Sequence, residues 1–301
     1  MVSPDGTRRI LHSKPLNLRA TLRPLQVWGR DPALRLTTTE AAWAIRSPEG
    51  PVSLHIRATP GLVDAGAWGP GTTWALERLD DLVGLTDDTE SFVTDHPLVR
   101  RLQREHAGIR LPRIHQVVRM LVPIVLEQLV TGTEAVRAYK HLERRVAEPA
   151  PGPMGLRLPP DPARLAGLPL EVYIACTALG KQGRTIKRLC ARADRMEEAA
   201  SMSFVAAARR LQALPGLGPW SAGSAMLRGL GFADAIILGD YHLPHVIANA
   251  LAGEERATDA RMVELLAPFK GHRGRVIRLI GAGFGGSRTR RGPRAPIRTW
   301  F

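Results

Sequence analysis

The chain has 301 residues with 44% hydrophobic and 23% charged side chains, which is typical of a globular protein and long enough for two domains. Its two cysteines, Cys176 and Cys190, exclude a disulfide framework and a cysteine-rich metal site, and no apolar run approaches the length that crosses a membrane. Lysine and arginine outnumber aspartate and glutamate by 42 to 28, which favours a polyanionic partner, although a genome biased toward arginine would give the same excess.

Residues 1–95 predict a small β-rich domain with one or two helices. Apolar side chains alternate or cluster in three short runs, at Leu25–Trp28, Ala41–Ile45 and Val52–Ile56. Proline and glycine turns separate these runs. No catalytic motif stands in this segment, and Asp87-Asp88 is interpreted as a solvated turn into the next domain.

Residues 96–282 predict a helical domain. An apolar stripe at helical spacing covers Arg113–Val130, where Pro123 should kink or divide the helix. Thr131 and Glu134 form a capping box, which predicts a helix that continues to about Val146. Further helices are expected at Leu170–Leu179, Gln182–Ala193, Ser203–Ala213, Trp220–Leu230, Tyr241–Leu251, Asp259–Leu266 and Arg273–Ile280.

The C-terminal end is strongly basic. No acidic residue follows Glu264, and residues 283–301 are expected to form a basic, mobile tail that tracks phosphates. The basic residues after Glu264 are Lys270, Arg273, Arg275, Arg278, Arg288, Arg290, Arg291, Arg294 and Arg298.

A glycine-rich turn between two predicted helices begins at Leu214, in the sequence Leu-Pro-Gly-Leu-Gly-Pro-Trp. Gly216 and Gly218 can both take positive φ, and Pro219 suits the first turn of a helix because its missing N–H would be unpaired there. The free backbone N–H groups at such a helix start can bind a phosphate. The turn therefore predicts a phosphate-binding hairpin.

An acidic residue, Asp240, follows twenty residues after Trp220 in a Gly-Asp-Tyr sequence. Aspartate is a favoured N-cap, so the residue can simply begin the next helix. A carboxylate beside a phosphate-binding hairpin can also stabilise the positive charge that develops on a sugar when an N-glycosidic bond is hydrolysed. The second interpretation indicates an enzyme that acts on nucleic acid.

Three further segments support this interpretation, at Ile124–Ala135, Leu179–Ile186 and Pro268–Arg273. With the hairpin and Asp240, they resemble the helix-hairpin-helix (HhH-GPD) DNA glycosylase superfamily, and most closely its DNA-3-methyladenine glycosylase II branch. The resemblance implies an α+β fold, in which a small antiparallel N-terminal sheet caps an all-helical glycosylase bundle. It also implies removal of alkylated purines from damaged double-stranded DNA, leaving an abasic site.

The same resemblance assigns roles within the site. Asp240 would stabilise the sugar cation and orient the attacking water. Trp220 stands where strand-cutting members carry a nucleophilic lysine, so simple hydrolysis is expected. Its ring would line the base pocket with Ser224 and Phe269, and core packing is the alternative for Trp220. Ser224 and Phe269 are smaller than the family's tyrosine and tryptophan, which leaves oxidised or deaminated bases as an alternative substrate class.

Other residues are candidates for DNA contact. Leu129, next to Gln128, matches the wedge that fills the space of an extruded base, although a core position on the apolar stripe is an equal alternative. Arg184, Lys270 and Arg273 are candidate phosphate contacts.

No metal or cofactor is expected, apart from a monovalent cation that the resemblance allows on the hairpin carbonyls. His242 and His245 lack the third ligand that zinc requires, and no cysteine follows Cys190 to hold an iron–sulfur cluster. We expect a monomeric, cytoplasmic, DNA-associated protein with no membrane partner. The alternative from another class is a non-catalytic DNA-binding protein that uses the hairpin and the arginine-rich end as an anchor.

Overall fold

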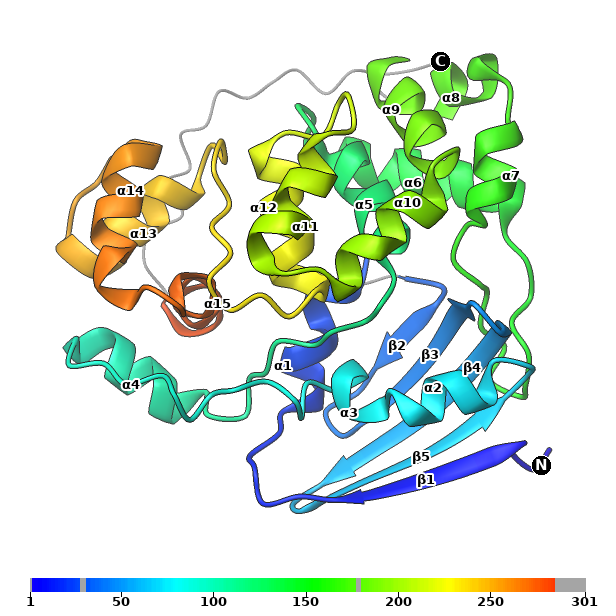
Figure 1. Ribbon diagram of the computed structural model, residues 1–301, viewed down its shortest axis with the longest axis horizontal. Helices are drawn as coiled ribbons and strands as arrows, with labels where there is room; N and C mark the ends of the chain where they lie inside the picture. The colour runs from blue at the N-terminus through cyan, green and yellow to red at the C-terminus, as the bar shows by residue number, and fades with distance from the viewer. Residues whose placement is uncertain (1, 28–30, 177–179, 285–301) are drawn as a thin grey trace.

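An antiparallel sheet at the N-terminus is joined to a body of helices in the computed structural model, which describes residues 2–27, 31–176 and 180–284 (Figure 1). The strands follow the order β1-β5-β4-β3-β2, and every neighbouring pair is antiparallel. They are β1 (Gly6–Leu11), β2 (Leu34–Leu36), β3 (Glu40–Ser47), β4 (Gly50–Thr59) and β5 (Leu62–Trp68). The α+β fold class expected from the sequence is confirmed.

One face of the sheet packs into the protein core, because Trp43, Leu54 and Val63 are fully buried at successive strands. The prediction of a strand at residues 25–28 is wrong where the structure describes them. Leu25 ends a short 3-10 helix, η1 (Arg23–Leu25), and its proline restricts the backbone. Trp28 lies outside the described residues.

Helices make up the rest of the described chain. Three short ones accompany the sheet: α1 (Leu18–Leu22), α2 (Thr72–Glu77) and α3 (Leu79–Leu82). The helical body contains α4 (Pro97–Glu105), α5 (Val117–Glu127), α6 (Gly132–Val146), α7 (Pro162–Gly167), α8 (Leu170–Cys176), α9 (Gly180–Cys190), α10 (Ala193–Glu197), η2 (Glu198–Ser201), α11 (Phe204–Gln212), α12 (Pro219–Gly229), α13 (Leu243–Ala252), α14 (Asp259–Leu266), η3 (Ala267–Phe269) and α15 (Arg273–Gly283). None of the described helices is long and apolar enough to cross a membrane.

The helix predicted at 113–130 is shorter than expected, and Pro123 does not divide it. Helix α5 begins only at Val117, because His115 has a positive φ of 53° and the carboxylate of Glu197 accepts the N–H groups of Val117 and Val118. Nine of the eleven residues of α5 are buried. This packing offsets the hydrogen bond that proline removes from the helix. The capping box of α6, by contrast, is confirmed: Thr131 and Glu134 bond reciprocally.

The interpretation of Asp87 as a solvated turn residue is wrong. Its side chain is 3% exposed and forms a two-pronged ion pair with Arg275 of α15, with N–O distances of 2.6 and 2.8 Å. Asp87 also accepts the backbone N–H of Leu111. The pair therefore fastens the segment after the sheet to the last described helix.

A continuous cluster of buried side chains extends from the sheet into the helical body, from Leu18 to Ile280. The predicted boundary between residues 95 and 96 falls just before α4, at whose N-cap His96 stands, and it stays a prediction. Most of the predicted basic tail, residues 285–301, lies outside the described residues.

Candidate active site and nucleic-acid interface

The glycine-rich turn joins α11 to α12. Gly216 takes a φ of 102°, and a Cβ at this position would lie 2.3 Å from Thr185 Oγ1. Only glycine satisfies both the backbone conformation and the close approach to α9. The expectation of a positive φ at Gly218 is wrong: this residue is extended, with φ −94°, and serves as the N-cap of α12. Pro219 occupies the first turn as predicted, and Leu214 is buried in the core.

Asp240 stands at the end of a segment that packs closely on α12. A Cβ on Gly223 would lie 2.3 Å from the carbonyl oxygen of Ile236, and Gly239 turns the chain with a φ of 79°. The Asp240 carboxylate is half-buried and accepts three N–H groups. Oδ1 accepts the backbone N–H groups of His242 and Leu243, both at 2.9 Å. Asp240 therefore holds the turn that leads into α13, which has His242 as its N-cap and begins at Leu243, two residues later than predicted.

The third donor to Asp240 is the side chain of Trp220. The indole Nε1–H donates to Oδ2 at 2.9 Å, so the edge of the ring points at the carboxylate. The ring is half-buried and also packs against the core. Trp220 thus contacts both the acid and the core, and its role in lining a base pocket stays a prediction.

The other two residues assigned to a base pocket lie in the interior. Ser224 is fully buried on α12, and its Oγ has no hydrogen-bond partner among the described residues. Phe269 in η3 is buried as well, and its ring meets His96 edge to face at a centroid distance of 6.0 Å. Their assignment to a pocket stays a prediction.

Leu129 projects into solvent from the loop between α5 and α6. It is 75% exposed and has a positive φ of 58°, so the alternative of a core leucine is wrong. The preceding residue, Gln128, donates its Nε2–H to the carbonyl oxygen of Gly216 at 2.9 Å and to Ser221 Oγ at 2.8 Å. This side chain connects the Leu129 loop to the hairpin.

The three candidate phosphate contacts have different surroundings. Arg184 on α9 and Lys270 after η3 are exposed. Arg273 is partly buried, and its Nε lies 2.7 Å from Asp234 Oδ1 in a two-pronged ion pair. A carboxylate already engages the Arg273 guanidinium, so Arg184 and Lys270 are the freer candidates.

The histidines beside Asp240 have other partners than a metal. His245 Nδ1 accepts the backbone N–H of Ala257, and His242 meets the ring of Tyr241 edge to face. Within the described ranges, no group of three His, Cys, Asp or Glu side chains could hold a metal ion. Sequence reasoning gave no role to Tyr241, which follows the acid directly and is 56% exposed. An exposed aromatic next to a candidate acid could have been noticed from the Gly-Asp-Tyr sequence.

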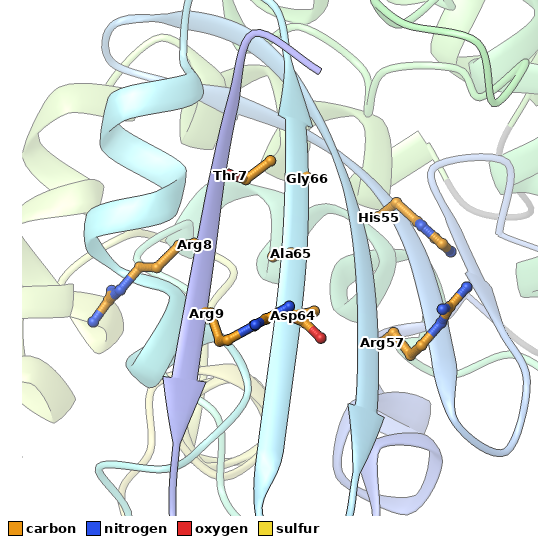
Figure 2. Close-up of a pocket in the computed structure, with 8 residues that line it drawn as sticks. All are labelled: Thr7, Arg8, Arg9, His55, Arg57, Asp64, Ala65 and Gly66. Carbon is orange, nitrogen blue, oxygen red and sulfur yellow. The ribbon is translucent and has the colours of Figure 1, made fainter. Parts of the chain in front are cut away.

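A hollow of about 490 Å³ lies on the outer face of the sheet (Figure 2). It forms over Gly66, which has no side chain to fill the space between Thr7 on β1 and His55 on β4. Its charged groups are compensated. Arg9 pairs with Asp64, and His55 and Arg57 both contact the carboxylate of Glu40. All the residues that line the hollow belong to β1, β4 and β5, and none of them contacts Asp240, so this hollow is separate from the Asp240 site.

No family model and no curated protein sequence matches the chain. Solved structures match its fold over nearly the whole length. A 3-methyladenine DNA glycosylase from Archaeoglobus fulgidus matches with a TM-score of 0.75 and 14% identity, covering 91% of this chain and 97% of that one. An 8-oxoguanine glycosylase/lyase from Clostridium acetobutylicum in its apo form matches with a TM-score of 0.70 and 13% identity, covering 93% and 99%. The same enzyme bound to double-stranded DNA matches with a TM-score of 0.68 and 12% identity, covering 93% and 97%.

Proposed function

We propose that this protein is a DNA glycosylase that hydrolyses the N-glycosidic bond of alkylated purines in double-stranded DNA and leaves an abasic site. The observation that carries the proposal is the Asp240 carboxylate, which three N–H donors hold beside the hairpin. The names of the two enzymes with similar folds, a 3-methyladenine and an 8-oxoguanine glycosylase, support the same general reaction. The chain would act as a monomer associated with DNA.

The hydrogen bonds of Asp240 favour an electrostatic role. An ionised carboxylate has about four acceptor positions, and three are occupied by N–H groups of the protein. The remaining position can face the sugar ring or hold one water molecule. Positive charge that develops on the sugar as the base departs would be stabilised by the fixed negative charge, and the attacking water would be oriented by the free oxygen position.

Simple hydrolysis without strand cutting is part of the proposal. Strand cutting by this route requires an amine that attacks the sugar carbon and forms a Schiff base. Trp220 occupies the position beside Asp240, and its only polar group, the indole N–H, is bound to that carboxylate. Heating or alkali should therefore be needed to break the product strand at the abasic site.

Extrusion of the base would rely on Leu129. Rotating a base out of the duplex costs a few kcal/mol, least for a damaged or weakly stacked base. Leu129 is exposed, and the preceding residue, Gln128, is hydrogen-bonded to the hairpin. An apolar side chain in this position is suited to fill the space that the base leaves in the duplex.

The test is base release from duplex DNA treated with a methylating agent. Wild-type protein should liberate methylated purines, while the Asp240→Asn variant should be slower by about 10²–10³-fold, the usual effect of removing one key charge-stabilising group. Binding to a duplex with a stable abasic-site analogue should be retained in D240N. Absence of release by the wild type, or an equal rate in the variant, contradicts the proposal.

A second candidate is a glycosylase of the same fold for oxidised or deaminated bases. It is favoured by the interior position of Phe269, because a pocket that this ring does not reach would offer less aromatic surface to a cationic base. Duplexes with single 8-oxoguanine, hypoxanthine or 3-methyladenine sites, compared in the same assay, separate the two candidates.

A further inference from the structure

A line of cations follows one side of α9 and continues past its end. Lys181, Arg184 and Arg188 recur at intervals of three and four residues, which is the spacing of a single helical face, and Arg192 follows in the turn before α10. All four residues are exposed. Within the described part of the chain, no ion pair involves any of them.

Neighbouring cations that do not belong to this line are already engaged. Lys187, on the other side of α9, donates to the carbonyl oxygens of Ala166 and Leu168, both at 2.7 Å. Arg195 and Arg210 share the carboxylate of Glu198. The cations of the line therefore have no acidic partner among the described residues, whereas the neighbouring cations are paired with a carboxylate or hydrogen-bonded to backbone carbonyls.

The line begins at the candidate active site. Gln182, the residue after Lys181, is buried and donates to the carbonyl oxygens of Leu126 and Gln128, at 3.0 and 2.9 Å. Gln128 immediately precedes the exposed Leu129. The first turn of α9 thus supports the Leu129 loop, and the helix leads away from that loop toward α10 (Figure 1).

We propose that one flank of the bound DNA runs along α9, with its backbone phosphates on Lys181, Arg188 and Arg192 as well as on the predicted contact Arg184. A helix rises 1.5 Å per residue, so Lys181 and Arg188 stand roughly 10 Å apart along α9, which spans about three phosphates of one strand. The identity of the polyanion rests on the proposed function. This phosphate path along α9 would contact the duplex on only one side of the damaged base. The stretch of DNA covered by the protein would therefore be asymmetric about that base.

Binding of the full chain to duplexes with a synthetic abasic site tests the path. The salt dependence of the dissociation constant is measured for wild type and for an Arg188→Gln, Arg192→Gln double variant. Each lost phosphate contact should lower the slope of log Kd against log salt by about 0.9, so the double variant should lose about 1.8. An Arg101→Gln, Arg104→Gln variant on α4 changes the same charge elsewhere on the surface and should lose little.

Two duplexes with a long arm on only one side of the abasic site test the asymmetry. The wild type should bind one of them more tightly, and the R188Q/R192Q variant should lose that difference while keeping its thermal midpoint. An unchanged slope, an equal loss in the α4 variant, or equal binding of both duplexes by the wild type overturns the path. If the slope falls as expected but the wild type releases no base, the path stands and the proposed activity fails.

Discussion

Asp240 meets two structural demands with one side chain. Its Oδ1 accepts the backbone N–H groups of His242 and Leu243 in the turn into α13, and its Oδ2 accepts the indole N–H of Trp220. The spacing of Asp240 from Trp220 can be recognised in the sequence, because each residue lies next to a short turn with its own glycine. The hydrogen bond from the indole cannot be predicted from the sequence. It depends on how closely α12, at Gly223, packs against the segment around Ile236 that precedes Asp240.

The Trp220→Phe substitution separates the ring from its hydrogen bond. Phenylalanine keeps most of the aromatic surface but cannot donate to Asp240. A hydrogen bond to a charged group contributes about 1.5–3 kcal/mol, so the rate of base release should fall by roughly 10- to 150-fold. Single-turnover rates on a methylated duplex provide the measurement. An unchanged rate would show that the carboxylate is held adequately by the backbone alone.

Leu129 adopts a backbone conformation that is unfavourable for leucine. A left-handed conformation costs about 1–2 kcal/mol for a residue with a Cβ, and glycine avoids that cost. We expect Leu129→Gly to leave the thermal midpoint equal or slightly higher, while base release from fully paired duplex becomes slower. Single-stranded substrate, which needs no extrusion from a helix, is the control and should be cleaved at the wild-type rate. A variant that is as active as wild type on duplex would remove the wedge role.

At the scale of elements, the hairpin shows where sequence reasoning succeeded and where it stopped. The turn, the proline in the first helical turn and the capping box of α6 follow from local preferences, and all were predicted. The difference between Gly216 and Gly218 depends on Thr185 in α9, which is distant in sequence. The length of α5 was also misjudged, because Glu197 and the backbone of His115 determine its start.

The two hairpin glycines form a matched pair for substitution. Alanine at Gly216 combines a strained backbone with a Cβ only 2.3 Å from Thr185 Oγ1, and we expect a loss of about 1–3 kcal/mol in the free energy of unfolding. Alanine at Gly218 meets an extended backbone and open space. Thermal or urea unfolding should therefore distinguish G216A strongly from G218A. Equal stability of the two variants would contradict the assigned geometry of the turn.

At the scale of the whole molecule, the ion pair of Asp87 and Arg275 joins segments separated by 188 residues. Such a contact leaves no local pattern in the sequence, and adjacent acids such as Asp87-Asp88 are usually solvated. Strands β1, β2 and β5 coincide with none of the three apolar runs in the sequence, and the reason for β1 and β5 is related. Their pairing places the first strand beside the last, and β1 alone is a short, charged segment.

Removing one partner of this pair should destabilise the whole fold. Arg275→Leu would leave the buried carboxylate of Asp87 unpaired, at a cost of about 3–5 kcal/mol. Arg261→Ala breaks the ion pairs with Glu254 and Glu264 on the solvent-exposed surface, and it should cost far less than the loss of Arg275. Chemical unfolding of both variants provides the comparison. Similar losses would mean that burial does not determine the contribution of the Asp87 pair.

Under the proposed function, the amide of Gln128 would affect the rate at which the protein searches along DNA. It donates to the carbonyl oxygen of Gly216 and to the hydroxyl of Ser221, and these two hydrogen bonds join the Leu129 loop to the hairpin. A protein that slides with its hairpin on the phosphates would then press Leu129 against each base pair it passes. Sliding would then be slower than for a protein whose wedge residue is on a flexible loop. Each base pair would be tested for weak stacking as the protein moves past it.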